Sequence, residues 1–188
     1  MQHFNLILLL FPLLASAFRF NSLPFGPDGN LTLPSPTLTP DFRIIFDLGQ
    51  RVAVGPGPWG QRNWIPFTGG RWVAKWGAGT IVDGGQDSQV VIGDLSARVE
   101  PTYVLKTADE TPAYILVKGL GWRTGRNEVL QKLGNPLLAD TVKPSEYKFF
   151  VHVQMETGDV RYNHTNTKMW IARGAKLGSK VVLDGYVL

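Results

Sequence analysis

The stretch YKFFVHVQME, residues 147–156, shows most clearly what kind of fold this chain adopts. Its odd-numbered positions are all apolar or aromatic, and its even-numbered positions include Lys148, His152, Gln154 and Glu156. Because successive side chains of a β-strand point to opposite faces of a sheet, this alternation predicts a strand with one face in a core and the other in water.

Similar segments lie on both sides of this strand. They are rich in Val, Ile, Tyr, Trp and Phe, and Gly, Pro, Asn and Asp separate them at the spacing of roughly 8–12 residues that is typical of all-β domains. We predict strands over residues 42–54, 71–81, 90–92, 98–107, 113–118, 147–156, 167–173 and 180–187. One short helix is expected at 127–133, where Val129, Leu130 and Leu133 have helical spacing and Gly134 is a stop signal.

The fold class expected from these elements is all-β, a single antiparallel β-barrel with one short helix. Closing a sheet into a barrel removes its exposed edges. We expect the mixed polar and aromatic face of the strands to line the lumen, which in a barrel of about eight strands is either filled by side chains or holds one small ligand.

The beginning of the chain predicts export. An apolar run at residues 6–14 precedes Ala15-Ser16-Ala17, the small-x-small pattern that signal peptidase cuts. We expect a signal peptide at 1–17, a Pro-rich N-terminal arm at 18–40 and the barrel domain at 41–188. Sequons at Asn30 and Asn163 predict N-glycosylation, so the mature protein is expected to be secreted or in the lumen of the secretory pathway.

Composition narrows the partners. The chain has no cysteine, which excludes disulfides, thiol catalysis and cysteine metal sites. The net charge of +4 comes from 19 basic and 15 acidic residues that form no long basic run, so nucleic-acid binding is not supported. After residues 6–14 no apolar stretch of about 20 residues follows, so stable membrane insertion is not expected.

Familiar catalytic motifs are absent or lack their context. Residues 55–60 spell G-x-G-x-x-G, but the two prolines remove amide donors and the following sequence is strand-like, so we reject a dinucleotide site. No G-x-S-x-G elbow surrounds any serine of the mature chain. The nearest approach to a metal site is His152 with Glu156, and such isolated pairs are usually surface residues; we expect no metal and no cofactor.

Two groups of residues are candidates for chemistry. Arg62, Asp83 and Asp87 flank glycine-rich turns that we place at one barrel mouth, where they would steer protons and hold oxyanions. The alternative for Asp83 is ordinary hairpin-turn chemistry, and for Arg62 a structural ion pair; both interpretations stay open. The second group lies on strands expected to be neighbours and consists of Tyr103, Lys106, Trp122, Arg123, Glu156 and Tyr162.

The roles expected for these residues follow from their side chains. Aromatic rings would cradle an unsaturated ligand, and cationic or phenolic groups would polarise a carbonyl or phenol. Ordinary barrel packing and solvated charges are the alternative. The expected catalytic residues are Arg62, Asp87, Tyr103, Arg123, His152, Glu156 and Tyr162. The expected substrate-binding residues are Trp64, Lys106, Trp122 and Asn166.

A series of segments resembles one known family. In order they are residues 60–70 (GQRNWIPFTGG), 77–87 (GAGTIVDGGQD), 103–107 (YVLKT), 121–125 (GWRTG), 155–158 (METG) and 166–170 (NTKMW). Over about residues 36–188 the chain resembles the domain-of-unknown-function 3237 family in its filamentous-fungal form. Two departures from the family pattern are Ser88, where a Trp is common, and residues 109–112, which replace an acidic-Gly turn.

This resemblance implies a lipocalin-like barrel similar to allene oxide cyclase, often self-associating, so a homo-oligomer is expected. It also implies a function: a secreted, cofactor-independent cyclase, pericyclase of the hetero-Diels–Alder kind, or isomerase that acts on a hydrophobic fungal secondary-metabolite intermediate in the lumen. The rival interpretation is a carrier that binds a small apolar ligand without turnover, and a third is an extracellular structural or host-directed protein that acts through its surface. Polar groups that converge inside the lumen favour catalysis, and an apolar lumen favours carriage.

Overall fold

The computed structural model describes residues 34–135 and 137–188. The expected signal peptide and the sequon at Asn30 lie outside these residues. Eleven strands form one sheet: β1 (Thr39–Leu48), β2 (Val52–Gly57), β3 (Gly60–Ala74), β4 (Gly77–Ile81), β5 (Gln86–Val91), β6 (Ala97–Val99), β7 (Pro101–Thr107), β8 (Tyr114–Gly125), β9 (Tyr147–Glu156), β10 (Trp170–Leu177) and β11 (Lys180–Val187). The helix α1 (Asn127–Gly134) and three 3-10 turns, η2 (Ala139–Thr141), η3 (Pro144–Glu146) and η4 (Asn163–Thr165), complete the described chain.

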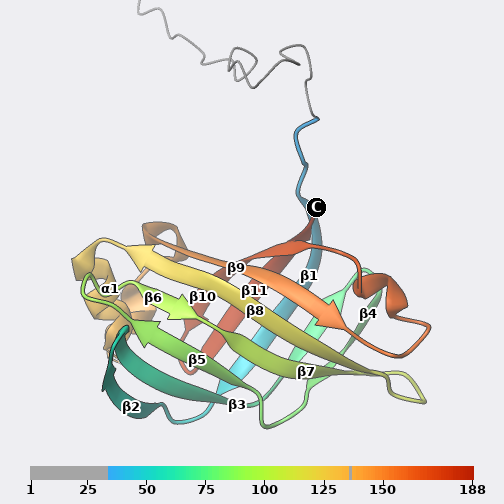
Figure 1. Cartoon of the computed structure of the whole chain (residues 1–188), viewed down its shortest axis with the longest axis horizontal. Helices are drawn as coiled ribbons and strands as arrows, with labels where there is room; N and C mark the ends of the chain where they lie inside the picture. The colour runs from blue at the N-terminus through green and yellow to red at the C-terminus, as the bar shows by residue number, and fades with distance from the viewer. Residues whose placement is uncertain (1–33, 136) are drawn as a thin grey trace, which may run out of the picture. The chain divides into compact units, whose positions relative to one another are not determined.

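The sheet is closed, which confirms the β-barrel predicted from the sequence. Strand β1 pairs with β11 on one side and with β3 on the other, and all the pairings are antiparallel. Around the barrel the order continues β11, β10, β9, β8, and from β8 the sheet reaches β3 by two routes, through β7 and β4 at one end and through β6 and β5 at the other (Figure 1). Helix α1 lies at the β6 and β5 end of the barrel (Figure 1).

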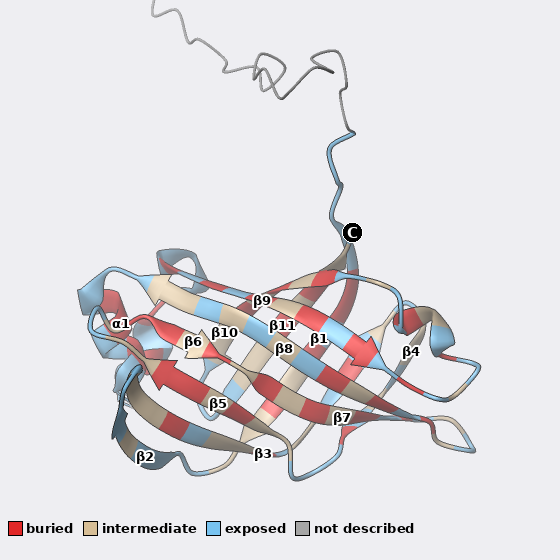
Figure 2. Cartoon of the chain, in the orientation of Figure 1, coloured by how far each residue is buried: buried red, intermediate tan, exposed pale blue. Residues whose placement is uncertain are grey.

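The apolar face of β9 points into the barrel. In β9 the odd positions are buried and the even positions are exposed or half-buried, as the alternation predicts (Figure 2). The expectation that the mixed polar and aromatic face lines the lumen is wrong. Burial of apolar side chains inside the barrel is favourable, so the apolar face of β9 points inward and its polar face is left in water.

Glycines explain why several strand boundaries differ from those expected. The segment 42–54 is two strands, β1 and β2, and 71–81 is the hairpin of β3 and β4. Strand β3 is much longer than expected because Gly69 and Gly70, with φ of 133° and 143°, bend it where other residues would be strained. A Cβ on Gly70 would lie 2.1 Å from the carbonyl oxygen of Ile45, so the close approach of β1 and β3 needs glycine there.

The end of the interior near β4 is filled by aromatic side chains. Trp72, Trp170 and Tyr162 are all buried there. The indole N–H groups of Trp76 and Trp170 both donate to Oδ2 of Asp41, at 3.2 and 2.7 Å, and satisfy this buried carboxylate. Any open space in the barrel therefore lies toward α1. Among the described residues no helix is both long and apolar enough to cross a bilayer.

Candidate functional site

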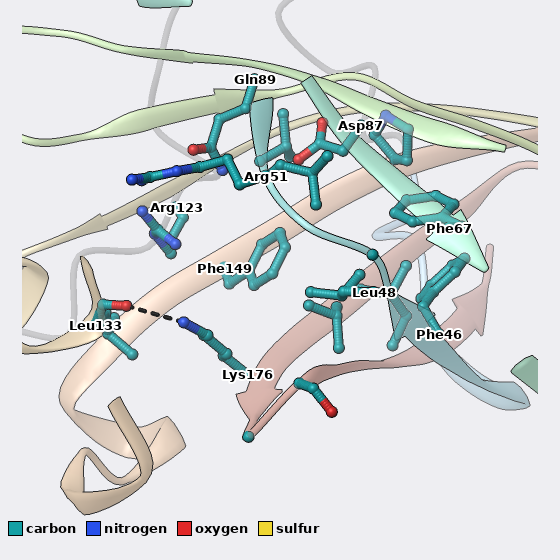
Figure 3. Close-up of a pocket in the computed structure, with 18 of the residues that line it drawn as sticks. Phe46, Leu48, Arg51, Phe67, Asp87, Gln89, Arg123, Leu133, Phe149 and Lys176 are labelled. Carbon is teal, nitrogen blue, oxygen red and sulfur yellow. Dashed lines mark hydrogen bonds between the residues drawn. The ribbon is translucent and has the colours of Figure 1, made fainter. Parts of the chain in front are cut away.

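A cavity of about 440 Å³ opens into the α1 end of the barrel. This volume lies within the range of roughly 300–1,000 Å³ that is usual for small-molecule sites. Three segments border it: the loop that joins β1 to β2, the end of α1, and the turn that joins β10 to β11. Figure 3 shows side chains from these segments and from the barrel wall converging on the cavity.

Most of the wall is apolar. Phe46, Phe67 and Phe149 present their rings, with aliphatic side chains between them, and the ring centroids of Phe46 and Phe67 lie 4.7 Å apart with the rings tilted by 39°. The Phe149 ring fits only because residue 174 is glycine, since a Cβ at Gly174 would lie 2.4 Å from that ring. The shape of the cavity is thus set by close packing and suits a hydrophobic molecule with flat parts.

Asp87 brings a carboxyl group into this apolar wall. It lies on β5, opposite Ile65 of β3 and Pro101 of β7, and only 9% of the residue is exposed. Its Oδ1 accepts a hydrogen bond of 2.7 Å from the backbone N–H of Glu100. Burial raises the pKa of Asp87 to about 6, although the Glu100 N–H and the charge of Arg123 both act to lower it. The group therefore changes charge near neutral pH.

Arg123 brings a guanidinium group to the same cavity. It lies on β8, paired with Ala97 of β6 and Phe149 of β9, and faces inward. Its Nε is buried and has no hydrogen-bond partner among the residues described. Burial lowers its pKa, and Tyr147 and Asp87 act in the opposite direction. A donor in this situation is free to bind an acceptor supplied by a ligand.

Lys176 and Arg51 add positive charge at the α1 end. Lys176 Nζ donates to the carbonyl oxygen of Leu133 at 3.2 Å (Figure 3). Burial lowers the pKa of this amine, and the charges of Arg123 and Arg51 lower it further, while Asp140 raises it. Arg51 is exposed on the loop at the cavity mouth.

A short amide network supports the wall beside Asp87. The Nδ2 of Asn63 donates to Oε1 of Gln89 at 3.3 Å, and both residues are buried. Gln89, two residues after Asp87 on β5, also lines the cavity.

The structure brings together two of the residues predicted from the sequence, Asp87 and Arg123. A third, Tyr103, lies behind the cavity wall, packed edge-on against Phe46 at 4.8 Å and against Phe67 at 6.0 Å. Its hydroxyl is buried and has no partner among the described residues. Burial raises its pKa above the ordinary value of a phenol.

Other predicted residues lie on the outside of the barrel, which corrects the expectation that they share the lumen. Trp64 and Trp122 are 44% and 43% exposed, and Lys106 is exposed as well. Arg62 donates to the carbonyl and hydroxyl oxygens of Ser88, each at 3.1 Å, and its Nη1 lies 3.7 Å from the carboxylate of Glu100. These contacts match the alternative interpretation of Arg62, a structural ion-pair partner.

His152, Glu156 and Asn166 also lie outside, along a shallow hollow between β8, β9 and the segment before β10. Asn166 caps the end of β9, because its side chain exchanges hydrogen bonds of 2.8 and 3.0 Å with the backbone of Thr157. Tyr162 lies at the filled end of the barrel, where its hydroxyl donates to Asp109 at 2.7 Å. His152 and Glu156 lie outside because they are on the outer face of β9, whereas Tyr162 and Asn166 lie in the connection between β9 and β10 and belong to no strand.

Asn163 and the glycine-rich motif can also be located. Asn163 begins η4 and is exposed, as an acceptor of a glycan must be. Asp83 and Gly84 form the turn between β4 and β5, with Gly84 at φ 104°. Residues 55–60 lie in the hairpin of β2 and β3, with no helix after the glycines.

Three of the polar cavity residues, Lys176, Gln89 and Arg51, were missed by sequence reasoning. The strand predicted at 167–173 stops before Lys176, and the one predicted at 90–92 begins after Gln89. In β10 the alternation Trp170, Ala172, Gly174 continues to Lys176, so a longer strand would have placed the lysine inside.

The site holds the parts needed for proton transfer and for binding a developing oxyanion. Within residues 34–135 and 137–188, no group of three His, Asp or Glu side chains is arranged to hold a metal ion. Asp87 can exchange a proton near neutral pH, and Arg123 can donate hydrogen bonds to a negative oxygen in an enclosed apolar space.

Comparisons with known proteins agree with this architecture. A UPF0311 protein of Bradyrhizobium diazoefficiens is 30% identical over 143 residues, which are 76% of this chain and 90% of that protein. The crystal structure of a beta-barrel like protein from Acinetobacter baumannii matches with a TM-score of 0.70 at 29% identity, over 84% of this chain and 99% of the other. The crystal structure of an enzyme from Penicillium herquei matches with a TM-score of 0.60 at 18% identity, over 84% and 98%. Residues 36–188 match the family described as "Protein of unknown function (DUF3237)", and the chain belongs to this family.

Proposed function

We propose that this protein is a cofactor-independent cyclase or isomerase that acts on a small hydrophobic molecule inside the barrel. The observation that carries the proposal is the placement of Asp87, a carboxyl group with a pKa of about 6, in the wall of a largely apolar cavity that also contains the guanidinium of Arg123. Titratable groups shifted toward neutral pH inside a cavity are typical of catalytic sites.

The proposed chemistry begins with Asp87 as a carboxylate. Asp87 takes a proton from an acidic O–H or C–H group of the substrate, and Arg123 stabilises the negative charge that develops on oxygen. The oxyanion or carbanion then attacks an electrophilic carbon of the same molecule to close a ring, or the double bond shifts. The protonated Asp87 returns its proton to the product, so no atom is gained or lost.

The apolar wall contributes to the same reaction. Phe46, Phe67 and Phe149 exclude water and hold the reacting ends of the substrate close together. Holding two ends in a near-attack arrangement can supply several kcal/mol of the barrier reduction. A pericyclic ring closure of the hetero-Diels–Alder kind would use this positioning, with Arg123 polarising a carbonyl oxygen.

The biological setting belongs to the proposal as well. The leader-like residues 1–17 and the exposed sequon at Asn163 support secretion of a glycosylated protein. The protein from Penicillium herquei that is described as an enzyme shares the fold, which supports the proposal. We propose that the substrate is an intermediate of fungal secondary metabolism.

A carrier of small apolar ligands is the second candidate. The observation that favours it is the aromatic and aliphatic lining of most of the cavity. A carrier needs no titratable group in the wall, and burial of the Asp87 carboxyl carries a cost in stability that a carrier would not require.

The two candidates differ in turnover. We would delete the gene in the producing organism, extract its small molecules and add the purified full-length protein to the extract. A compound that accumulates on deletion and is converted in molar excess over the protein, with defined stereochemistry, supports the enzyme. The variant Asp87→Asn should convert it about 10²–10⁴ times more slowly, the usual contribution of a general base.

The matched control is Glu156→Gln. It makes the same chemical change on the outer face of β9, where Glu156 is exposed, and it should convert the compound at the wild-type rate. An unchanged metabolite profile, or compounds that only co-purify with the protein, would overturn the enzyme proposal in favour of carriage.

A further inference from the structure

The charges around the cavity are unevenly distributed. In the view of Figure 3, Arg51, Arg123 and Lys176 lie toward Leu133 and α1, and Phe46 and Phe67 lie on the other side. The cavity therefore has a cationic end near its mouth and an aromatic floor.

The cationic end is poorly neutralised by the protein itself. Of the described residues, Asp87 is the one carboxylate in the cavity wall, and it forms no ion pair with Arg123. Asp140 lies near Lys176, where it accepts the N–H of Gly178. Two carboxylates thus lie near three cations, and the positive charges of the three cations repel one another.

The hydrogen-bonding groups are also incompletely used. The buried Nε of Arg123 has no partner in the described chain, and the ammonium of Lys176 has one neutral acceptor, the carbonyl of Leu133. A guanidinium and an ammonium at the edge of a dry cavity are the donors that proteins use to bind planar oxygen anions.

We propose that the ligand of this cavity carries an anionic oxygen group, a carboxylate or an ionised phenol or enol, which binds between Arg123 and Lys176 while the apolar body of the ligand packs on Phe46, Phe67 and Phe149. This inference rests on the proposed function in that it names the substrate class of the same site. Arg51, at the mouth, attracts the anion and does not determine its final position, because its side chain is exposed.

Binding of simple probes tests the inference without turnover. The full-length protein is titrated calorimetrically with 2-naphthoate and with 2-naphthamide, its neutral analogue of nearly equal shape. We expect the naphthoate to bind about tenfold more tightly or better, as charge-assisted hydrogen bonds allow. A second pair, 4-nitrophenolate and 4-nitroanisole at about pH 8, separates phenolate-type from carboxylate recognition.

Variants then assign the preference to the cavity. Arg123→Gln and Lys176→Gln should each bring the two affinities of a pair within about threefold of each other. The control Lys118→Gln removes one charge from the outer face of β8, where Lys118 is exposed, and should keep the full preference. Two independent variants are used so that a failure of one to fold leaves the test intact.

The possible failures are distinguishable from those of the proposed function. Equal binding of the acid and the amide, retention of the preference in both cavity variants, or no binding of either anion at about 10 mM would overturn the anion inference. Conversion of a metabolite that depends on Asp87 would still stand in that case. A clear anion preference without turnover would keep the inference and favour a carrier of acidic ligands.

Discussion

Asp87 and Arg123 face the same cavity with opposite charges and yet form no ion pair in the described structure. The carboxyl group uses Oδ1 to accept the backbone N–H of Glu100, and the guanidinium keeps a buried donor without an acceptor. A close buried pair would have satisfied both groups and lowered the pKa of the acid well below its usual range. Their separation leaves each group able to act on a bound molecule.

The first prediction concerns the pH dependence of turnover. Because the proposed base is the ionised form of Asp87 and its pKa is about 6, kcat/KM should rise about tenfold between pH 5 and pH 7 and then level off. Initial rates on the metabolite converted in extracts would measure this profile. A rate that is flat across this range, in a protein that stays folded, would remove Asp87 from proton transfer.

The second prediction concerns stability. In the unfolded chain the pKa of Asp87 is about 3.9, so the folded state, with a pKa of about 6, holds the proton more tightly. The stability of the native protein therefore falls as the pH rises from about 4 through 6. Asp87→Asn removes this loss, and its free energy of unfolding should exceed that of the wild type by up to about 3 kcal/mol at pH 8 and by almost nothing at pH 4.

Urea unfolding at both pH values measures this difference. Glu156→Gln, on the exposed side of β9, should stay within about 0.5 kcal/mol of the wild type at each pH. If wild type and Asp87→Asn lose stability in parallel as the pH rises, burial does not disfavour the carboxylate.

The third prediction separates two tyrosines. Tyr103→Phe removes a buried hydroxyl without a partner, so the free energy of unfolding should stay the same or rise by about 1 kcal/mol, and turnover should persist. Tyr162→Phe removes a hydroxyl that donates to Asp109 at 2.7 Å and should lose about 1 kcal/mol. A fall in turnover of tenfold or more for Tyr103→Phe, with stability maintained, would restore the catalytic role predicted from the sequence.

The fourth prediction concerns the glycine beneath the cavity. In Gly174→Ala the new methyl group would lie 2.4 Å from the Phe149 ring, and the strain should cost about 1–3 kcal/mol. Phe149 must also move into the cavity, so binding of 2-naphthoate should weaken. The control is Gly93→Ala, where no atom lies within 4 Å of the new methyl group and stability should change by less than about 1 kcal/mol. Equal stability of the two variants would show that Phe149 can relax at no cost.

The sequence predicts the sheet better than it predicts the site. Strands β9 and β11 and the helix α1 follow from strong patterns with clear breaks at both ends, and their boundaries agree with the structure to within a residue. Strand β3 could not be predicted whole. In the sequence the glycines at 69 and 70 indicate a turn, but in the structure they bend a continuous strand.

The assignment of faces was the main source of error at the site. A period of two shows that a strand has two faces, and only the closed sheet shows which face is inside. This is why Arg123 was predicted together with its outward neighbour Trp122. Lys176 was overlooked for a different reason, because the predicted strand ended at residue 173 and β10 continues to Leu177. Asp87 was predicted at a barrel mouth and lines the cavity, but it was grouped with Arg62, which lies on the outer face.

The filled end of the barrel, where Trp170 and Trp76 both donate to Asp41, also limits how small molecules enter and leave the cavity. A compound that reaches the aromatic floor through the mouth near α1 has to leave by the same route, and its apolar part, which lies deepest, leaves last. In the proposed enzyme, product and the next substrate molecule would therefore exclude each other from this passage. For the proposed enzyme, we expect competitive inhibition by product as the consequence of this one-sided architecture, so that the concentration of product outside the protein would regulate its rate.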